Sequence, residues 1–131
     1  MNYLVDTHIL LWSFLETKKL SRNIKKILLD ETNIIYYSPI SLWEISIKFA
    51  LKKLFLKGGT PDDFFAEVQK SYYQCKEINA ANLVSYYKLP IYHKDPFDRL
   101  LIWNAIKSDF TLLSVDENMK MYEKEGLKVE Y

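Results

Sequence analysis

Short β-rich runs alternate with longer stretches of helical periodicity along the whole chain, and this alternation limits the folds open to it. Strands are predicted at 3–5, 33–37, 110–115 and 127–129, with a weaker candidate at 73–78. Helices are predicted between them, at 8–14, 21–29, 39–54, 61–68, 80–87, 97–107 and 116–123. Strands that alternate with helices favour a parallel sheet covered on both faces. We therefore predict an α/β fold of three layers, α/β/α, around a mostly parallel sheet of four to five strands.

Size and composition are consistent with one domain that spans residues 1–131. About half of the chain is apolar (49%), which is enough for a substantial core, and no linker or internal repeat divides it. The formal net charge is only +1, so the overall balance gives no sign of nucleic-acid binding. Any affinity for nucleic acid must then come from a local group of Lys and Arg residues.

The single cysteine, Cys75, excludes an internal disulfide and suits a reducing cytosol. We expect it to be a small buried apolar residue rather than a nucleophile. The amino-terminal residues do not have the pattern of a signal peptide, and no apolar run approaches the roughly 20 residues of a membrane span. We therefore expect a cytoplasmic protein without a membrane segment.

Acidic residues follow two predicted strands at the end where sites form in parallel sheets. Asp6 comes directly after the first strand and Asp116 after the strand at 110–115, while Asp98 lies in the first turn of a helix. Each position has a simpler explanation when taken alone. Asp6 or Asp116 could cap a helix, and Asp98 could complement a helix dipole. The agreement of three distant acids on one edge of the sheet favours a shared site.

Glu44 lies on an apolar face of its predicted helix, beside Ile40, Ile47 and Leu51. A buried carboxylate costs several kcal/mol unless it is paired or bound to a metal ion. The alternatives are that Glu44 extends to solvent or pairs with Lys48.

The opposite side of this helix is also apolar, with Leu42, Ile45 and Phe49. A helix that is apolar on two sides is either deeply buried or covered by another chain. We expect this second side to contact another protein chain.

Four converging carboxylates, from Asp6, Glu44, Asp98 and Asp116, would repel one another unless a cation neutralised them. Oxygen ligands suit Mg²⁺ or Mn²⁺, and two such ions can promote phosphodiester hydrolysis. No Gly-rich phosphate loop and no Cys/His zinc cluster is present, and His93 is interpreted as a loop residue near the site or as a solvated one.

The chain resembles the PIN-domain ribonucleases, in particular the VapC-like toxins of bacterial toxin–antitoxin pairs. The resemblance covers nearly the whole sequence. It is carried by Y-L-V-D-T-H at 3–8, S-x-x-S-x-W-E-I-x-I-K at 38–48, D-P-F-D-R-L-L-I at 95–102 and L-L-S-V-D at 112–116. The fold is then expected to be PIN-like.

This resemblance implies a metal site made of Asp6, Glu44, Asp98 and Asp116, with Asp116 at a position that varies in the family. It also implies a Mg²⁺- or Mn²⁺-dependent endoribonuclease that uses two ions during catalysis, forms a homodimer and is blocked by a separate antitoxin. Ser114 matches a position where the family often has Ser or Thr. Asp95 is interpreted as the helix cap before Pro96 and as a support of the metal ligands.

Phosphate contacts are expected from Lys48, Lys94 and Arg99, with solvated surface or pairing with the acids as the alternative. Two other functions remain open at this point. An aspartyl-phosphate phosphatase would require a second acid two residues after Asp6, where His8 stands instead. A binding module that keeps the fold without catalysis would be favoured by loss of the acids, all four of which are present.

Overall fold

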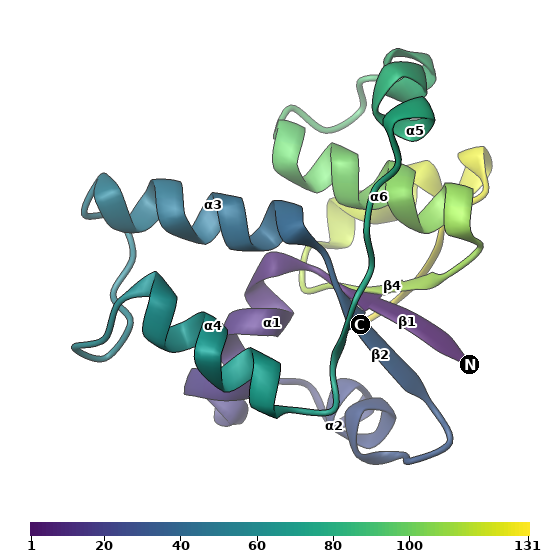
Figure 1. Cartoon of the computed structure of the whole chain (residues 1–131). Coiled ribbons are helices and arrows are strands. Elements are labelled where there is room, and N and C mark those ends of the chain that lie inside the picture. Colours follow the sequence, from purple (N-terminus) through teal and green to yellow (C-terminus); the bar gives the residue numbers. More distant parts are fainter.

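A five-stranded parallel sheet forms the centre of the computed structural model, which describes residues 1–131 (Figure 1). All four strand pairings are parallel, so the predicted parallel sheet is confirmed with five strands. The strands follow the order β3-β2-β1-β4-β5. Their bounds are β1 Asn2–Val5, β2 Ile34–Tyr37, β3 Gln74–Cys75, β4 Thr111–Leu113 and β5 Lys128–Glu130.

Side chains of the central strands alternate between two hydrophobic cores, one on each face of the sheet. In β1, Tyr3 and Val5 enter one core and Leu4 enters the other, and in β4 Leu113 and Leu112 divide in the same way. This explains why these strands carry apolar residues at consecutive positions, since both of their faces are buried. The three-layer α/β/α arrangement is therefore confirmed.

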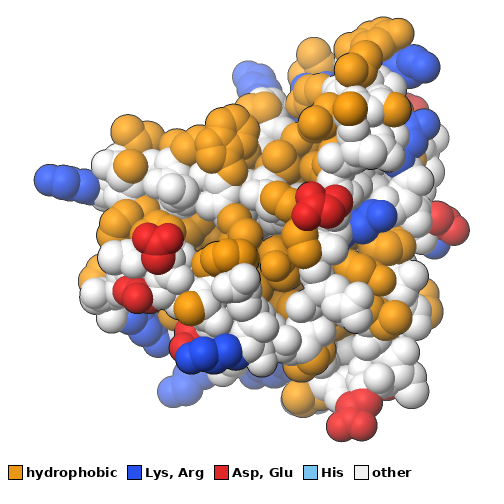
Figure 2. All heavy atoms as spheres, in the orientation of Figure 1, with side chains coloured by type: hydrophobic (Ala, Val, Ile, Leu, Met, Phe, Trp, Pro, Cys, Tyr) orange, Lys and Arg blue, Asp and Glu red, His pale blue; other side chains and the backbone are white.

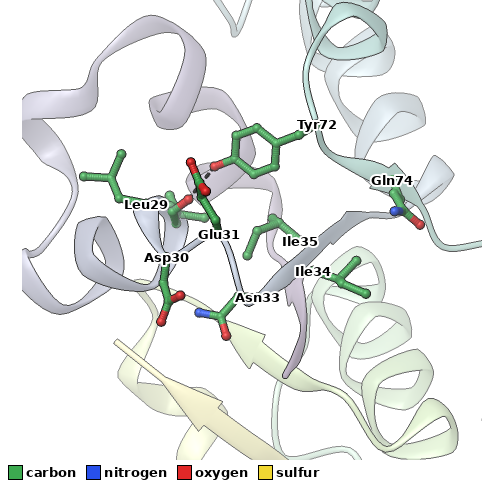
Figure 3. A pocket seen from close by; sticks show the side chains of 9 residues that line it. Leu29, Asp30, Glu31, Asn33, Ile34, Ile35, Tyr72 and Gln74 are labelled. Atoms are coloured by element: carbon green, nitrogen blue, oxygen red, sulfur yellow. Dashed lines mark hydrogen bonds between the residues drawn. The ribbon is translucent and has the colours of Figure 1, made fainter.

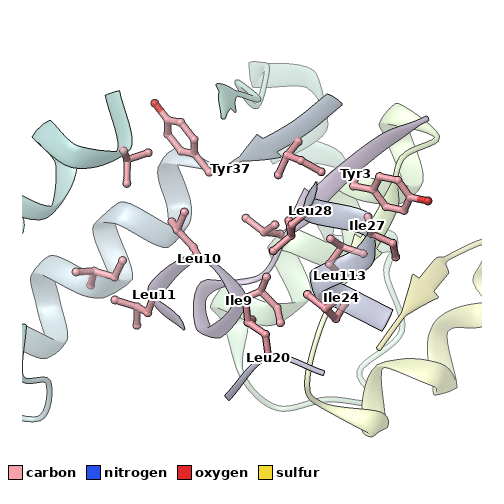
Figure 4. Packing of buried hydrophobic residues seen from close by; sticks show 14 of the residues in the cluster. Tyr3, Ile9, Leu10, Leu11, Leu20, Ile24, Ile27, Leu28, Tyr37 and Leu113 are labelled. Carbon is pink, nitrogen blue, oxygen red and sulfur yellow. The ribbon is translucent and has the colours of Figure 1, made fainter. Parts of the chain in front are cut away.

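The first core lies under four helices (Figure 4). Among the labelled side chains, Ile9 packs beside Ile24 and Leu113, and all three are nearly or fully buried. Burial of each such aliphatic side chain contributes roughly 1.5–3 kcal/mol. The helices that contribute to this core are α1 Thr7–Leu15, α2 Arg22–Leu29, α3 Pro39–Ala50 and α4 Pro61–Lys70, with the short 3₁₀ turn η1 Thr17–Lys19 between the first two.

The second core lies on the opposite face of the sheet. It is closed mainly by α6, whose Leu101, Ile102 and Ala105 are fully buried, and by Tyr122 from a carboxyl-terminal 3₁₀ helix. The elements on this side are α5 Ala80–Ser85, η2 Tyr86–Lys88, α6 Pro96–Ser108 and η3 Glu117–Glu125. None of the helices is both long and apolar enough to cross a lipid bilayer.

Helix starts follow the capping residues that the sequence offers. The Ser38 hydroxyl accepts the N–H of Ile40 ahead of Pro39, and Asp95 accepts the N–H groups of Phe97 and Asp98 ahead of Pro96. A proline in the first turn fits because its missing N–H has no helical partner there. The predicted cap at Asp95 is confirmed.

Three elements differ most from the prediction, two in their length and one in its helix type. The helix predicted to reach residue 54 ends at Ala50, because Lys52 takes a left-handed conformation (φ 58°) that stops the helix. The strand candidate at 73–78 shrinks to Gln74–Cys75, and the predicted helix at 116–123 is the 3₁₀ helix η3. Cys75 was expected to be buried and is exposed, because β3 is the edge strand of the sheet and leaves one side open.

The predicted contact side of α3 is partly covered within the chain itself. Ile45 is buried in the first core, and Leu42 and Phe49 are half-buried against it, because α3 packs on α1 and α4. The exposed apolar residue of this helix is Trp43, which contacts Phe97 of α6 edge to face. Figure 2 shows hydrophobic side chains at the surface along α3 and around α5, where Val84 is also exposed.

Candidate metal centre

Two acids follow the two strands that flank the point where the chain reverses its direction of winding. β1 is central, the chain first adds β2 and β3 on one side of it, and then β4 and β5 on the other. Asp6 follows β1, and Asp116 follows β4, at the carboxyl edge of the sheet. In open α/β sheets this crevice is where ligands bind.

Asp6 is held at the start of α1 by two hydrogen bonds. Its Oδ1 accepts the N–H of Ile9 at 2.8 Å, and its Oδ2 accepts the Ser114 hydroxyl at 2.6 Å. Its side chain is buried, and burial raises the pKa of Asp6 above its ordinary value although both hydrogen bonds act to lower it. The predicted cap role of Asp6 is confirmed, and this role leaves lone pairs on both oxygens.

Glu44 reaches the same region from α3 and is as buried as Asp6, at 2% exposure. Its Oε1 accepts the Thr7 hydroxyl at 2.7 Å, and that hydroxyl lies 3.0 Å from the Ser41 hydroxyl. Its Oε2 contacts the ammonium group of Lys48 in an ion pair. The pairing with Lys48 that the sequence left open is therefore present, and Glu44 does not extend to solvent.

The pKa of Asp98 is raised by its surroundings, as is that of Asp6. Asp98 lies in the first turn of α6, and its pKa is raised to about 7 by burial, by Asp95 and Asp6, and by Glu44, against a lowering by His93. Like charges raise the pKa of a carboxyl only when they lie close to it. The raised pKa of Asp98 therefore indicates that Asp95, Asp6 and Glu44, which come from three separate segments of the chain, lie near it.

Asp116 is held by a different set of partners. Its Oδ1 accepts the N–H of Asn118, and its Oδ2 lies 2.7 Å from Nε2 of His93. Although burial alone would raise it, the pKa of Asp116 lies below its ordinary value because of the hydrogen bonds from His93 and Asn118. The backbone N–H of Asp116 donates to the Ser114 hydroxyl at 3.0 Å, so Ser114 joins Asp116 to Asp6.

The structure brings three of these side chains into direct proximity and places the other two beside them. Oxygens of Asp98 and Asp116 and a ring nitrogen of His93 lie within 4.8 Å of one another. Asp6 is linked to Asp116 through Ser114, while Glu44 is hydrogen bonded to Thr7 and affects Asp98 through its charge. The donors are carboxylate oxygens, the ligand type that Mg²⁺ and Mn²⁺ prefer, and the only cysteine lies elsewhere, on β3. The residues present therefore fit a divalent cation.

The three predicted phosphate contacts are in different environments. Lys94 is exposed in the loop before α6, and the side chain of Lys48 remains 40% exposed beside Glu44. Arg99 is buried, and its guanidinium donates to the Tyr86 hydroxyl and the carbonyl of Leu89. The guanidinium is bound inside the fold to the chain segment before α6, so it does not face solvent. The predicted phosphate contact at Arg99 is therefore wrong.

The sequence reasoning left two functional neighbours without a role. Thr7 binds Glu44, and its position directly after Asp6 at the end of a strand was the available signal. His93 is not simply solvated: its side chain is 14% exposed and lies between Asp98 and Asp116. The position of His93, two residues before Asp95, indicated that it lies in the loop before α6. It gave no indication of the direction in which the ring points.

A separate surface pocket of about 470 Å³ lies at the other end of the sheet, where α2 leads into β2 (Figure 3). Leu29, Ile34 and Tyr72 line it, and the Tyr72 hydroxyl points to the carbonyl of Leu28. None of the four acids lines this pocket, so it is separate from the candidate metal centre.

The fold is similar to that of solved toxin–antitoxin complexes. It matches VapBC2 from Rickettsia felis bound to a promoter DNA fragment (TM-score 0.70, 20% identity, 99% of this chain and 98% of that chain). It also matches VapBC-1 from nontypeable Haemophilus influenzae (TM-score 0.67, 17% identity, 99% and 97%) and FitAcB from Neisseria gonorrhoeae (TM-score 0.64, 15% identity, 98% and 96%). At these identities the likeness concerns the fold.

Comparison with curated protein sequences gives no match. The family model of the PIN domain, in contrast, matches residues 3–125, a range that includes all four acids of the site. The chain therefore belongs to the PIN domain family.

Proposed function

We propose that this protein is a metal-dependent endoribonuclease and the toxin of a toxin–antitoxin pair. The observation that carries the proposal is the convergence of carboxylates at the carboxyl edge of the sheet, where burial and the charges of Asp95, Asp6 and Glu44 raise the pKa of Asp98 to about 7. Acids that crowd in this way favour a cation between them. The family match and the toxin–antitoxin complexes of similar fold support the nuclease and toxin roles.

In this proposal Asp6, Glu44 and Asp98 hold a principal Mg²⁺ or Mn²⁺ ion, and Asp116 supports a second ion or orients water. A bound divalent ion supplies activation of water and neutralises charge on the reacting phosphate. Ser114 and Thr7 orient the carboxylates of Asp6 and Glu44 through their hydroxyls. Asp95 holds the start of α6 and thereby places Asp98.

Lys48 and Lys94 are the proposed contacts to the RNA backbone. Lys94 is exposed beside His93 and Asp95, and the ammonium group of Lys48 is partly exposed at the edge of the acidic group. Contacts of this kind supply affinity without sequence selection, and they fit a chain whose overall charge is close to neutral.

The proposed partners are an antitoxin and a second copy of this chain. Toxin–antitoxin complexes with the same fold support the first. Exposed apolar side chains at Trp43, Val84 and Tyr87 support a protein contact near α3 and α5, since exposed apolar patches mark interaction sites (Figure 2). Light scattering of wild-type protein and of Trp43→Asp tests the second copy, and a monomeric wild type contradicts it.

A binding module without catalysis is the second candidate. It is favoured by the ion pair of Glu44 with Lys48 and the contact of Asp116 with His93, which satisfy two of the acids without any metal ion. In this function the acidic group would serve only to shape the fold.

The test is cleavage of fluorescent single-stranded RNA by purified protein with Mg²⁺, with Mn²⁺ and with excess EDTA. We expect cleavage with metal, none in EDTA, and recovery when Mn²⁺ is restored. Asp6→Asn should abolish cleavage and remain folded, because Asn is also a good helix cap. Asp62→Asn, at an exposed acid in the first turn of α4, is the matched control.

Cleavage that persists in EDTA, or in Asp6→Asn, would refute the metal mechanism. A wild type that binds RNA without cutting it would favour the binding module. The toxin role is tested separately, by growth arrest on expression in a bacterial host and its relief by the product of an adjacent small gene.

A further inference from the structure

The ring of His93 has both of its nitrogen atoms in defined contacts. Its Nε2 lies 2.7 Å from Oδ2 of Asp116 and 3.4 Å from Oδ2 of Asp98, and only the shorter contact has the geometry of a hydrogen bond. On the other side of the ring, the backbone N–H of Asp95 donates to Nδ1 at 3.1 Å. The ring is therefore held from both sides.

These contacts determine where the proton of the neutral ring lies. A backbone N–H can only donate, so Nδ1 must present a lone pair to Asp95. The proton of neutral imidazole is then on Nε2, which donates to Asp116. An Nε2 that carries a proton has no lone pair for a metal ion, although it lies among oxygens of the proposed ligands Asp98 and Asp116.

The loop that carries His93 is fixed by a buried phenol. The Tyr122 hydroxyl accepts the backbone N–H groups of Tyr92 and His93, each at 2.9 Å, and donates to the carbonyl of Pro90 at 2.9 Å. Tyr122 is fully buried and belongs to η3, the helix that Asp116 caps. The helix η3 therefore begins at the Asp116 carboxylate and also contains Tyr122, which anchors the loop that carries His93.

We propose that His93 is a positioning residue of the metal centre: its Nε2–H holds Asp116 beside Asp98, the Tyr122 hydroxyl holds the loop that carries His93, and His93 does not bind the ion. The proposal rests on the proposed function and adds to it a residue and an anchor. It explains why a ring whose Nε2 lies so close to two carboxylates is bonded to Asp95 through its other nitrogen, Nδ1. Partners that orient metal ligands in this way typically change metal affinity by about 10–100-fold when they are removed.

The first measurement is the tautomer of His93, by long-range ¹H–¹⁵N NMR of the metal-free protein. The chain has only two histidines, so His8→Ala leaves the His93 signals alone in the spectrum. We expect the neutral ring with its proton on Nε2. A proton on Nδ1 would overturn the proposal, because Nε2 would then be free to bind the ion.

The second measurement is Mn²⁺ affinity by calorimetry without RNA, on His93→Ala, His93→Gln and Tyr122→Phe. We expect His93→Ala to weaken binding roughly tenfold or more. His93→Gln should recover most of it, since its amide N–H can reach Asp116. Tyr122→Phe keeps the buried ring but loses the anchor, so its affinity should fall between wild type and His93→Ala. Tyr92→Phe, which loses only a contact of its hydroxyl with Glu125 at the surface, is the matched control.

Pulsed electron paramagnetic resonance of the Mn²⁺ complex then separates positioning from ligation. We expect no coupling to a directly bound ¹⁴N nucleus, and such a coupling would overturn the proposal. Mn²⁺ affinity in His93→Ala equal to wild type, or His93→Gln as weak as His93→Ala, would also overturn it. Failure of wild-type protein to bind Mn²⁺ would instead contradict the proposed function, and the NMR result would still decide the tautomer.

Discussion

The two halves of the acidic site are built in different ways. Asp6 and Glu44, here the buried pair, are each 2% exposed and are held by hydroxyl groups and a lysine. Asp98 and Asp116, here the loop-supported pair, have side chains 18% and 30% exposed, and His93 from a loop lies between them.

The difference indicates which half is fixed by the fold itself. The donors to the buried pair, Thr7 and Ser114, lie next to central strands, so they are placed as soon as the sheet and α1 form. The loop-supported pair depends in addition on residues 90–95, whose position comes from contacts with η3. We therefore expect the buried pair, with Asp98 as the third ligand, to fix the position of the principal ion. The loop-supported pair should adjust the affinity of the site for that ion and its pH dependence.

The largest expected effect compares one acid from each pair. Glu44→Gln should weaken Mn²⁺ binding by roughly 100-fold or more, since even residues that only orient ligands cost about 10–100-fold, and Asp116→Asn should weaken it less, by about tenfold. Both variants should stay folded. The measurement is calorimetry, with Glu67→Gln, an exposed acid paired with Lys70, as the control. Equal losses in the two variants, or an unchanged affinity in Glu44→Gln, would remove the distinction between the pairs.

The next effect concerns pH and Asp98. Its pKa of about 7 in the folded protein lies above the ordinary value of 3.8, so between these values the folded chain keeps a proton that the unfolded chain has lost. The free energy of unfolding of the metal-free protein should therefore fall as pH rises from about 4 to 7, and less so in Asp98→Asn. Mn²⁺ must displace this proton, so its affinity should rise up to about tenfold per pH unit below pH 7.

Thermal unfolding in EDTA and calorimetry across this pH range check both parts. Asp116 works in the opposite direction, because its pKa lies below the ordinary value and its contribution to stability is lost only in more acidic solution. A wild type whose stability does not change between pH 4 and 7, or changes as in Asp98→Asn, would show that Asp98 is not crowded by the other acids.

A smaller effect is expected where the two pairs are joined. Ser114→Ala removes the buried hydroxyl that donates to Asp6 and accepts from the N–H of Asp116. We expect a loss of about 1–3 kcal/mol in the free energy of unfolding and of about tenfold in Mn²⁺ affinity. Denaturant unfolding and calorimetry measure these, with exposed Ser46→Ala as the control. If stability falls while metal affinity does not, Ser114 supports only the fold.

The smallest effect should come from Lys94, outside both pairs. Lys94→Gln should reduce RNA affinity only a few-fold and lower the salt dependence of binding by about one phosphate contact. Fluorescence anisotropy with inactive Asp6→Asn protein at several salt concentrations measures both. Lys26→Gln, at an exposed position of α2, should change neither. An identical loss from Lys26→Gln would show that binding is not localised at the site.

Local patterns were sufficient to predict the sheet and the positions of the acids. The apolar strands followed by Asp6 and Asp116 predicted that these acids lie at the carboxyl edge of the sheet. The apolar neighbours of Glu44 predicted that its side chain is buried. These predictions depend on contacts between residues close in sequence or on the rules of parallel sheets.

The errors arose where distant contacts decide. The packing of α3 across α1 and α4 buries Ile45, and a local pattern cannot show which of two apolar sides is covered. Arg99 looked like a surface cation because its partners, Tyr86 and the carbonyl of Leu89, are not adjacent in sequence. The orientation of His93 depends on Tyr122, which lies 29 residues away along the chain.

The sheet ends in very short strands on both sides. β3 has two residues and β5 has three, so each border exposes only a small row of unpaired backbone groups. Such borders give an extended peptide little to bond to and oppose uncontrolled stacking of sheets from different molecules. We therefore expect a protein that binds this domain to contact its side chains, chiefly those on the helices, rather than to add a strand to the sheet.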